Sequence, residues 1–541
     1  MNRARVLLIA PTACLAIAAA PGCEAPSAPS SEAASEREMP EEGGTFRLLT
    51  QLPVSLDPPV GFDASTGNII YQLFDGLVRL DVNLNPIPAL AESWKVSRDG
   101  LTYTMRLRPN VRFHDGSLLG PEDVVYSYKR ILKLSMASPS LGLDSLRLVE
   151  GLENWQSGNA DARVAIEAPD PKTVVIRLRQ KAPYFLASLA DTRLSIVPKS
   201  VVERVGDAEF GRRPVGTGPF RFESWESHGV RLVRFDDHFR GAPLLDAVEF
   251  RAFPMTPGDT PLALLERGEL DLAQAFERVD RPEANERRGP IVRHRNPGIY
   301  FLGFNIELEP LDDARVRRAI GRAIDRSRLT TTNPNRPATE PVAASGFVPP
   351  GLRGYSPDRF VPPFDPSAAR RLLKEAGFEE DEEIGPIPLW SLGPTPDEEK
   401  IVSNLREIGI RVRPKAVHWF ELQRALSDGR VSMFILGDLA FLPDAAPMLD
   451  TLFRSNGVAN FFNYSNPAVD QLIDLALESY DSERHLEICR QIQTLVASDM
   501  PCVPLYFDSE AFAVSQRVRD LELSPFGLNH IHLGRTWLAT R

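Results

Sequence analysis

Few of the residue patterns that catalysis requires occur in this chain of 541 residues. It has four cysteines and eight histidines, and no Cys/His cluster has the spacing of a zinc site. The motifs G-x-S-x-G and H-E-x-x-H are absent, and Gly216-Thr217-Gly218 lacks the spacing and the lysine of a phosphate-binding loop. The formal net charge of −11 argues against a nucleic-acid partner, which needs a basic surface. We therefore expect no catalysis, no cofactor, no metal and no bound nucleic acid.

Two histidine-containing segments leave other interpretations open. His114-Asp115 joins a base to an acid, as in half of a hydrolytic triad, but it lies at a predicted hairpin turn, which favours a solvated tip. His530-Ile531-His532 places two imidazoles on one face of a strand, but no third metal ligand accompanies them, which favours a surface pair. A secreted hydrolase would need a nucleophile and a base within reach, and the sequence offers no such pair.

Long apolar runs are also scarce, and the clearest one lies at the N-terminus. Val6–Ala20 follows a short basic stretch and is shorter than the ~20 apolar residues that span a bilayer. We predict a secretory signal peptide over residues 1–22. The last residues before Cys23 resemble the lipobox of bacterial lipoproteins, although Ala20 replaces the usual Leu and Pro21 is atypical. We expect lipidation of Cys23; the alternative is an ordinary cleavage site with an incidental cysteine.

Residues 23–43 are rich in Glu, Ala, Pro and Ser and contain no aromatic residue. Such a segment cannot bury enough apolar surface to offset its chain entropy, so we expect a flexible tether. A folded body on a tether beside a lipidated cysteine suits a protein held at a membrane, in the periplasm or at the cell surface. Two cysteines remain, Cys489 and Cys502, which either pair in an oxidising compartment or stay as buried free thiols.

The rest of the chain, roughly 500 residues, is too long for one ordinary domain and mixes two periodicities. Leu101–Leu107 alternates with the period of two of a half-buried strand. Residues 316–324 place apolar side chains at helical spacing, and Pro467–Ser498 predicts a long helical pair. This mixture predicts an α/β protein with more than one mixed sheet.

Several segments occur in an order that one known family shares. The most specific is Leu107–Gly116, which runs into Glu122–Ser127. The other blocks are Ala91–Trp94, Gly216–Phe220, Leu265–Leu272, Phe304–Arg326, Asp365–Phe378, Asn463–Asp470 and Pro504–Tyr506. Together they cover roughly residues 45–520. They resemble the bacterial extracellular solute-binding proteins of family 5, which are oligopeptide, dipeptide or nickel ABC-transporter substrate-binding lipoproteins.

This resemblance implies a type II periplasmic-binding-protein fold, an α/β architecture in which two lobes close about a hinge and an extra domain is added. The domains that it implies are lobe I over residues 44–76, 191–300 and 511–541, an extra domain over 77–190, and lobe II over 301–510. It also implies that the chain is a monomer and that His114-Asp115 is structural rather than catalytic.

The function that the resemblance implies is capture of peptides or similar small solutes between the lobes and delivery to the permease subunits of an ABC importer. The lipid anchor would hold the protein at the membrane. The same fold also accommodates an oligosaccharide, a metal chelate or an amino-acid conjugate, or serves as a surface sensor. These alternatives stay open, and a secreted hydrolase is the remaining one.

One segment carries much of the ligand recognition in peptide-binding relatives and reads roughly Gly-Trp-x-x-Asp-Tyr-x-x-Pro, with the Asp on the ligand's α-amino group. The matching stretch is Gly437–Ala445, which puts Asp438 at the Trp position and Phe441 at the Asp position. A buried ammonium without a partner is costly, so Phe441 cannot bind it. We expect Asp438, Phe441 and Asp444 to belong to the ligand site, with Asp438 or Asp444 facing the ligand.

Four further residues complete the predicted site. Trp419 matches a cleft tryptophan of the peptide binders, where an aromatic ring stacks on a ligand or lines a pocket; a core Trp at a helix start is the alternative. Tyr300 and Phe301 lie on a strand near the cleft in relatives, with core burial as the alternative. Asp57 lies beside the edge of the first lobe.

Overall fold

The computed structural model describes residues 39–61, 64–137, 146–152, 163–253, 259–274, 288–329, 342–379, 382–440, 442–524 and 527–540. The predicted signal peptide, Cys23 and nearly all of the predicted tether lie outside these ranges. Within the described residues, no helix is long and apolar enough to cross a membrane. All elements below belong to one compact unit, Glu41–Arg541.

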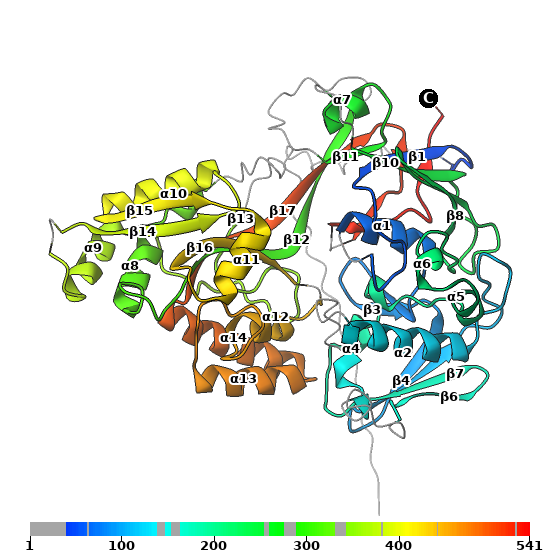
Figure 1. Ribbon diagram of the computed structural model, residues 1–541, viewed down its shortest axis with the longest axis horizontal. Coiled ribbons are helices and arrows are strands. Elements are labelled where there is room, and N and C mark those ends of the chain that lie inside the picture. The colour runs from blue at the N-terminus through cyan, green and yellow to red at the C-terminus, as the bar shows by residue number, and fades with distance from the viewer. Residues whose placement is uncertain are drawn as a thin grey trace, which may run out of the picture. The chain divides into compact units, whose positions relative to one another are not determined.

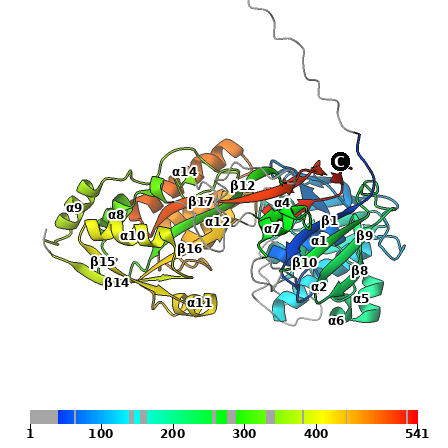
Figure 2. The ribbon, with the colours of Figure 1, turned by 90° about the horizontal axis from the view of Figure 1, so that it is seen from above.

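The largest sheet among the described residues has eleven strands, in the order β15-β14-β16-β12-β17-β11-β1-β10-β9-β8, and β13 pairs with β17 beside this path. Two long antiparallel strands, β12 (Arg288–Phe304) and β17 (Cys502–Ser515), join its two halves (Figures 1 and 2). Their ladder is interrupted where Arg295 opposes Ser509 but Ile299 opposes Phe507, because β12 carries extra residues there. Two further register shifts interrupt the ladder, between Arg288 and Ile291 and between Tyr300 and Phe301, so the pairing is irregular at several points.

We call β1, β8, β9, β10 and β11 the first half of the sheet. Their bounds are β1 Thr45–Thr50, β8 Phe220–Glu226, β9 Gly229–Arg234, β10 Ala247–Ala252 and β11 Leu272–Gln274. Side chains of β1 alternate between buried and half-buried, as expected of a strand with one face on a core. Phe46 and Leu48 share that core with Ile69 and Leu73 of α1 (Ala64–Leu73). The other helices here are α5 (Lys199–Val205), α6 (Asp207–Phe210) and α7 (Pro261–Glu266).

We call β13, β14, β15 and β16 the second half of the sheet. Their bounds are β13 Val342–Ala343, β14 Ile384–Ser391, β15 Ile410–Ala416 and β16 Met433–Leu439. One core contains Ile320 and Leu405 and packs α8 (Ala314–Ala323), α9 (Pro366–Glu375) and α10 (Pro396–Glu407). A second core contains Leu422, Leu449 and Ile492 and packs α11 (Trp419–Ser427), α12 (Ala445–Phe453), α13 (Pro467–Glu478) and α14 (Ser482–Asp499).

Three helices of the second half begin with the same local signal. Asp365, Thr395 and Asn466 each accept a backbone N–H bond as the N-cap, and a proline follows each of them at the first helical position. The cap satisfies a free backbone donor, and proline has no N–H to leave unbonded there. The sequence therefore fixes these helix starts locally.

A separate antiparallel sheet has the strand order β4-β5-β7-β6. Its strands are β4 Ala91–Val96, β5 Thr102–Leu107, β6 Ile166–Asp170 and β7 Thr173–Arg177. Helix α2 (Pro121–Ala137) packs on it through Tyr128 and Ile131, which share a core with Tyr103 and Met105. A hairpin of β2 (Val78–Leu80) and β3 (Pro86–Pro88) precedes it, and α4 (Phe185–Ser188) follows it. We call β4–β7 with α2 the small sheet domain.

The C-terminal segment adds two short pairs of strands to the first half. They are β18 (Val518–Arg519) with β21 (Trp537–Leu538), and β19 (Glu522–Ser524) with β20 (Gly527–His532). Ile531 and Leu533 lie in the core that contains α1. His532 is bonded to the Tyr71 hydroxyl at 2.9 Å and stacks edge-on against its ring.

The predicted α/β mixture with more than one sheet and the predicted helical pair at α13 and α14 are confirmed. The solvated tip expected at His114 is wrong for the histidine, although Asp115 is exposed. His114 Nδ1 accepts a hydrogen bond from Gly216 N at 3.1 Å and Nε2 lies 3.0 Å from Gly218 O, while burial lowers the pKa of the imidazole to about 4. Its role is to fasten the glycine turn, not to titrate near neutral pH.

Cys489 on α14 and Cys502 on β17 are buried free thiols, so the alternative of a disulfide is not realised. Burial raises the pKa of the Cys489 thiol to about 12, which keeps it protonated and unreactive.

Candidate functional site

The segment that ends strand β16 has one free edge. On one side, residues 433–439 pair antiparallel with 298–304 of β12. On the other side, β14 pairs with β16 only at Met433 and Phe434. Among the described residues, the backbone groups of 435–439 therefore have no strand partner on that edge. Such an edge can pair with an extended ligand.

Asp438 lies on this segment, opposite Ile299 of β12, and is half-buried. Burial raises the pKa of its carboxyl from 3.8 to about 7, although a backbone hydrogen bond from Leu439 opposes the shift. Among the described residues, no basic side chain pairs with Asp438. A half-buried carboxylate without a cation is costly to ionise and is a candidate for a ligand's positive charge.

Asp444, the second predicted carboxylate, is occupied by partners within the chain. It caps α12 by accepting a bond from Ala446 N at 2.9 Å. Its two oxygens contact Arg353 Nη1 at 2.9 Å and His485 Nε2 at 3.1 Å. Burial opposes its ionisation, but the hydrogen bond and charge of His485 lower the pKa of Asp444 below its usual range. Asp444 therefore anchors the end of the stretch Gly437–Ala445, which we call the recognition segment.

His485 completes this buried cluster from the first turn of α14. Its Nδ1 lies 3.1 Å from the carbonyl oxygen of Ala476, and its Nε2 faces Asp444. His485 therefore links the carbonyl oxygen of Ala476 to Asp444 through its two ring nitrogens. Arg353 and His485 were not predicted from the sequence, and no local pattern marks either of them.

Trp419 begins α11 and is 43% exposed, so it is not a core residue. Its neighbour Phe420 is 81% exposed. A hydrogen bond of 2.9 Å from Val417 N to Ser391 O ties this start of α11 to the end of β14, where Leu392 is also exposed. Three large apolar side chains thus remain uncovered where β14 leaves β16.

Tyr300 and Phe301 neighbour each other on β12 but face different surroundings. Tyr300 is half-buried and stacks on Tyr506 with ring centroids 5.0 Å apart. It also lies across Gly437, where an added Cβ would come within 2.7 Å of the Tyr300 ring. Phe301 is buried in the core against Phe462. The core alternative therefore describes the position of Phe301, while Tyr300 is partly accessible beside β16.

Asp57 is buried in the first half and bonded to Arg130, with contacts of 3.0 and 2.5 Å. Arg130 also contacts Asp207 at 2.8 Å. Burial raises the pKa of the Asp57 carboxyl, and the hydrogen bond and charge of Arg130 oppose that shift. Phe441 lies outside the described residues.

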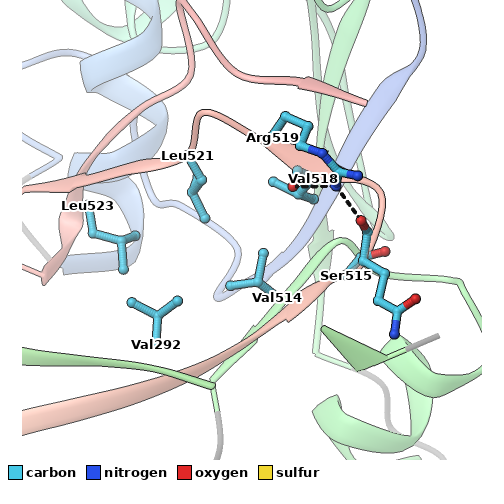
Figure 3. A pocket seen from close by; sticks show the side chains of 8 residues that line it. Val292, Val514, Ser515, Val518, Arg519, Leu521 and Leu523 are labelled. Carbon is cyan, nitrogen blue, oxygen red and sulfur yellow. Dashed lines mark hydrogen bonds between the residues drawn. The ribbon is translucent and has the colours of Figure 1, made fainter. Parts of the chain in front are cut away.

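A pocket of about 500 Å³ lies elsewhere in the chain, between β12, β17 and the C-terminal strands (Figure 3). Aliphatic side chains dominate its wall, namely Val292, Val514, Val518, Leu521 and Leu523, with Ser515, Gln516 and Arg519 at its polar side. It includes none of the predicted ligand residues. In the part of the chain that the structure describes, no three His, Cys, Asp or Glu side chains are grouped to hold a metal ion.

This fold is that of a substrate-binding protein with a solved structure, the ABC transporter substrate-binding protein CtaP from Listeria monocytogenes. The two agree with a TM-score of 0.78 at 24% identity, over 92% of this chain and 100% of that chain. The predicted α/β fold of the type II periplasmic-binding-protein class is thus confirmed.

Sequence similarity then identifies the family. Residues 85–460 match the bacterial extracellular solute-binding proteins, family 5. The chain belongs to this family, as the ordered motif blocks predicted. It is 26% identical to the dipeptide-binding protein DppE of Bacillus subtilis over 494 residues, which cover 88% of each chain. It is also 26% identical to heme-binding protein A of Haemophilus influenzae over 528 residues, covering 93% of this chain and 94% of that protein.

Proposed function

We propose that this solute-binding protein captures a peptide or peptide-like solute through its protonated amino group, which Asp438 binds. The observation that carries the proposal is the Asp438 carboxylate, which has no basic partner among the described residues and whose pKa of about 7 reflects a cost that a bound ammonium would remove. Asp444 is the less suitable of the two predicted carboxylates, because Arg353 and His485 already neutralise it.

The free edge of β16 supports a peptide ligand in particular. An extended peptide can add to residues 435–439 as a strand, so that main-chain hydrogen bonds supply sequence-independent affinity. Asp438 then fixes the end of the peptide that carries the amino group. Trp419, exposed at the start of α11, offers a ring on which a ligand side chain can stack.

The complete role includes delivery and anchoring. We propose that the two halves of the sheet correspond to two lobes that close on the ligand about β12 and β17, and that the closed protein presents the solute to permease subunits of an ABC importer. Lipidation of Cys23 would keep the protein at the membrane outside the cytoplasm. The predicted limits of lobe I, lobe II and the extra domain belong to the same proposal, as does a monomeric state.

The test compares Asp438→Asn with the natural chain. Native mass spectrometry of the purified protein identifies any retained solute, and a thermal-shift screen then uses di- to pentapeptides in free and N-acetylated forms. We expect free peptides to raise the melting temperature, and both acetylation and Asp438→Asn to remove that shift. Asp474→Asn is the matched control, because Asp474 is exposed on α13 and pairs with Arg454. Equal binding of acetylated and free peptides would contradict the proposal.

A non-peptide solute is the second candidate. The uncovered apolar side chains Leu392, Trp419 and Phe420 favour a ligand with a flat apolar surface. The same screen should include porphyrins, metal chelates and oligosaccharides. A ligand whose binding survives Asp438→Asn but is lost in Trp419→Ala supports this candidate over the peptide.

A further inference from the structure

The turn between α13 and α14 reaches the small sheet domain through one side chain. The Tyr480 hydroxyl donates a hydrogen bond to Gly100 O at 3.1 Å and lies 3.2 Å from the Tyr103 hydroxyl. The Tyr103 hydroxyl in turn donates to Ala182 O at 3.1 Å. A residue of the second half's helices is thus bonded to the β4–β5 hairpin.

Gly100 at the tip of that hairpin fits the tyrosine ring closely. An added Cβ would lie 2.8 Å from the Tyr480 hydroxyl oxygen and 3.0 Å from a ring carbon. The backbone at Gly100 has φ of +76°, a conformation that also favours glycine. Both the backbone conformation and the close approach of the Tyr480 ring therefore favour glycine at this position.

A second contact comes from the tip of the β2–β3 hairpin. Leu84 is only 6% exposed, and it is buried in the same apolar cluster as Phe347, Trp390 and Phe434 of the second half. Its φ is +65°, which is unfavourable for leucine. The neighbours of Leu84 at this tip, Asn83 and Asn85, are polar. We take the unfavourable conformation of Leu84 to be offset by burial of its side chain in the cluster.

Arg353 contacts both the turn that carries Tyr480 and the recognition segment. Arg353 Nη2 donates to Ser479 O at 2.7 Å, and Arg353 Nη1 contacts Asp444 at 2.9 Å. His485 joins Asp444 to the first turn of α14, which begins just after Tyr480. Asp444, at the end of this segment, is therefore linked through Arg353 and His485 to the turn that carries Tyr480.

We infer that Tyr480 and Leu84 form a latch by which the region of residues 77–190 holds the second half in the closed, ligand-retaining arrangement. This inference rests on the proposed function, because it takes closure as the capture step. The added region would then control how long a solute stays bound, although none of its residues need touch the solute. Removing the latch lowers the population of the binding-competent form and so weakens apparent affinity.

The experiment uses the full chain and the variants Tyr480→Phe and Tyr480→Phe/Leu84→Ala. Small-angle X-ray scattering of the ligand-free protein measures the radius of gyration, and hydrogen exchange measures the protection of amides 97–103. We expect a larger radius, faster exchange in the hairpin, and solute dissociation about three- to tenfold faster for the loss of one hydrogen bond. Tyr126→Phe is the control, because Tyr126 packs against the first half's core and has no hydrogen bond among the described residues.

Unchanged scattering and unchanged hairpin exchange in both variants would overturn the latch. These two readouts need no ligand, so they separate the latch from the proposed function. If Asp438→Asn leaves peptide binding intact while Tyr480→Phe enlarges the protein, the amine site fails and the latch stands. Retention of cooperative unfolding in Tyr480→Phe, which removes a single oxygen atom, ensures that the comparison is between folded proteins.

Discussion

Replacing Asp438 with Asn should make the protein more stable and, at the same time, unable to hold a ligand's amine. The carboxyl has a pKa of about 7 in the folded protein against an ordinary 3.8, so the ionised form is disfavoured by the fold. One pKa unit corresponds to about 1.4 kcal/mol, and a half-buried group therefore costs roughly 2–4 kcal/mol when it must be ionised. Asparagine has nearly the same shape and no charge to bury.

The sign of this effect depends on pH. Below about pH 4 the carboxyl is protonated in the folded and the unfolded chain, and the two proteins should be equally stable. As pH rises from about 4 to 7, the unfolded chain releases its proton while the folded chain retains it, so the natural protein loses stability relative to the variant. For a chain of this length, 1 kcal/mol shifts the melting temperature by about 1 °C, so the variant should melt about 2–4 °C higher at pH 8.

Ligand affinity should show the opposite dependence. The ionised carboxylate binds the ammonium, so affinity at pH 6 should be about tenfold weaker, and at pH 5 about a hundredfold weaker, than the limit above pH 7. Above about pH 8 a peptide's α-amino group loses its proton and affinity falls again. Calorimetric titration from pH 5 to 9 measures this bell-shaped profile. A flat profile, or an Asn variant less stable than the natural protein at pH 8, would refute the reasoning.

Three other changes separate the remaining roles. Asp444→Asn leaves Arg353 and His485 without their shared carboxylate and should lower the free energy of unfolding by about 2–4 kcal/mol, measured by denaturant titration at pH 7; an unchanged midpoint contradicts the anchoring role. Trp419→Ala should weaken solute binding about five- to twentyfold in calorimetry, with a melting temperature within about 1 °C because the ring is exposed; equal loss of stability would place the ring in the core instead. Cys23→Ser should move the protein from the membrane fraction to the soluble fraction of its host, and continued sedimentation with membranes argues against lipidation.

The features that the sequence predicted well are local ones. The apolar spacing of residues 316–324 and the helical pattern of Pro467–Ser498 depend on neighbours within one or two helical turns, so the observed helices follow directly. The motif blocks predicted the fold because they occur in order along most of the chain. Asp438 was named as a ligand candidate from the alignment of a single segment.

The parts that could not be predicted depend on pairings across long stretches of chain. Arg353 lies 91 residues from Asp444, and nothing near either residue indicates that they meet. For this reason Asp438 and Asp444 are equally good candidates for the ligand's amine from the sequence alone. In the structure they differ, because Arg353 and His485 contact Asp444. The burial of His114 could not be predicted for the same reason, because its hydrogen-bond partner Gly216 lies 102 residues further along the chain.

The register shift in β12 before Ile299 lies directly beside the proposed ligand site. It ends at Ile299, and Ile299 is the residue that opposes Asp438. This irregularity of the ladder and the proposed charge contact therefore meet at one residue pair. If the two halves close about β12 and β17 as proposed, rotation there would displace Asp438 less than distant elements such as α13, because displacement grows with distance from the pivot. A bound amine would then stay close to its carboxylate during the proposed closure.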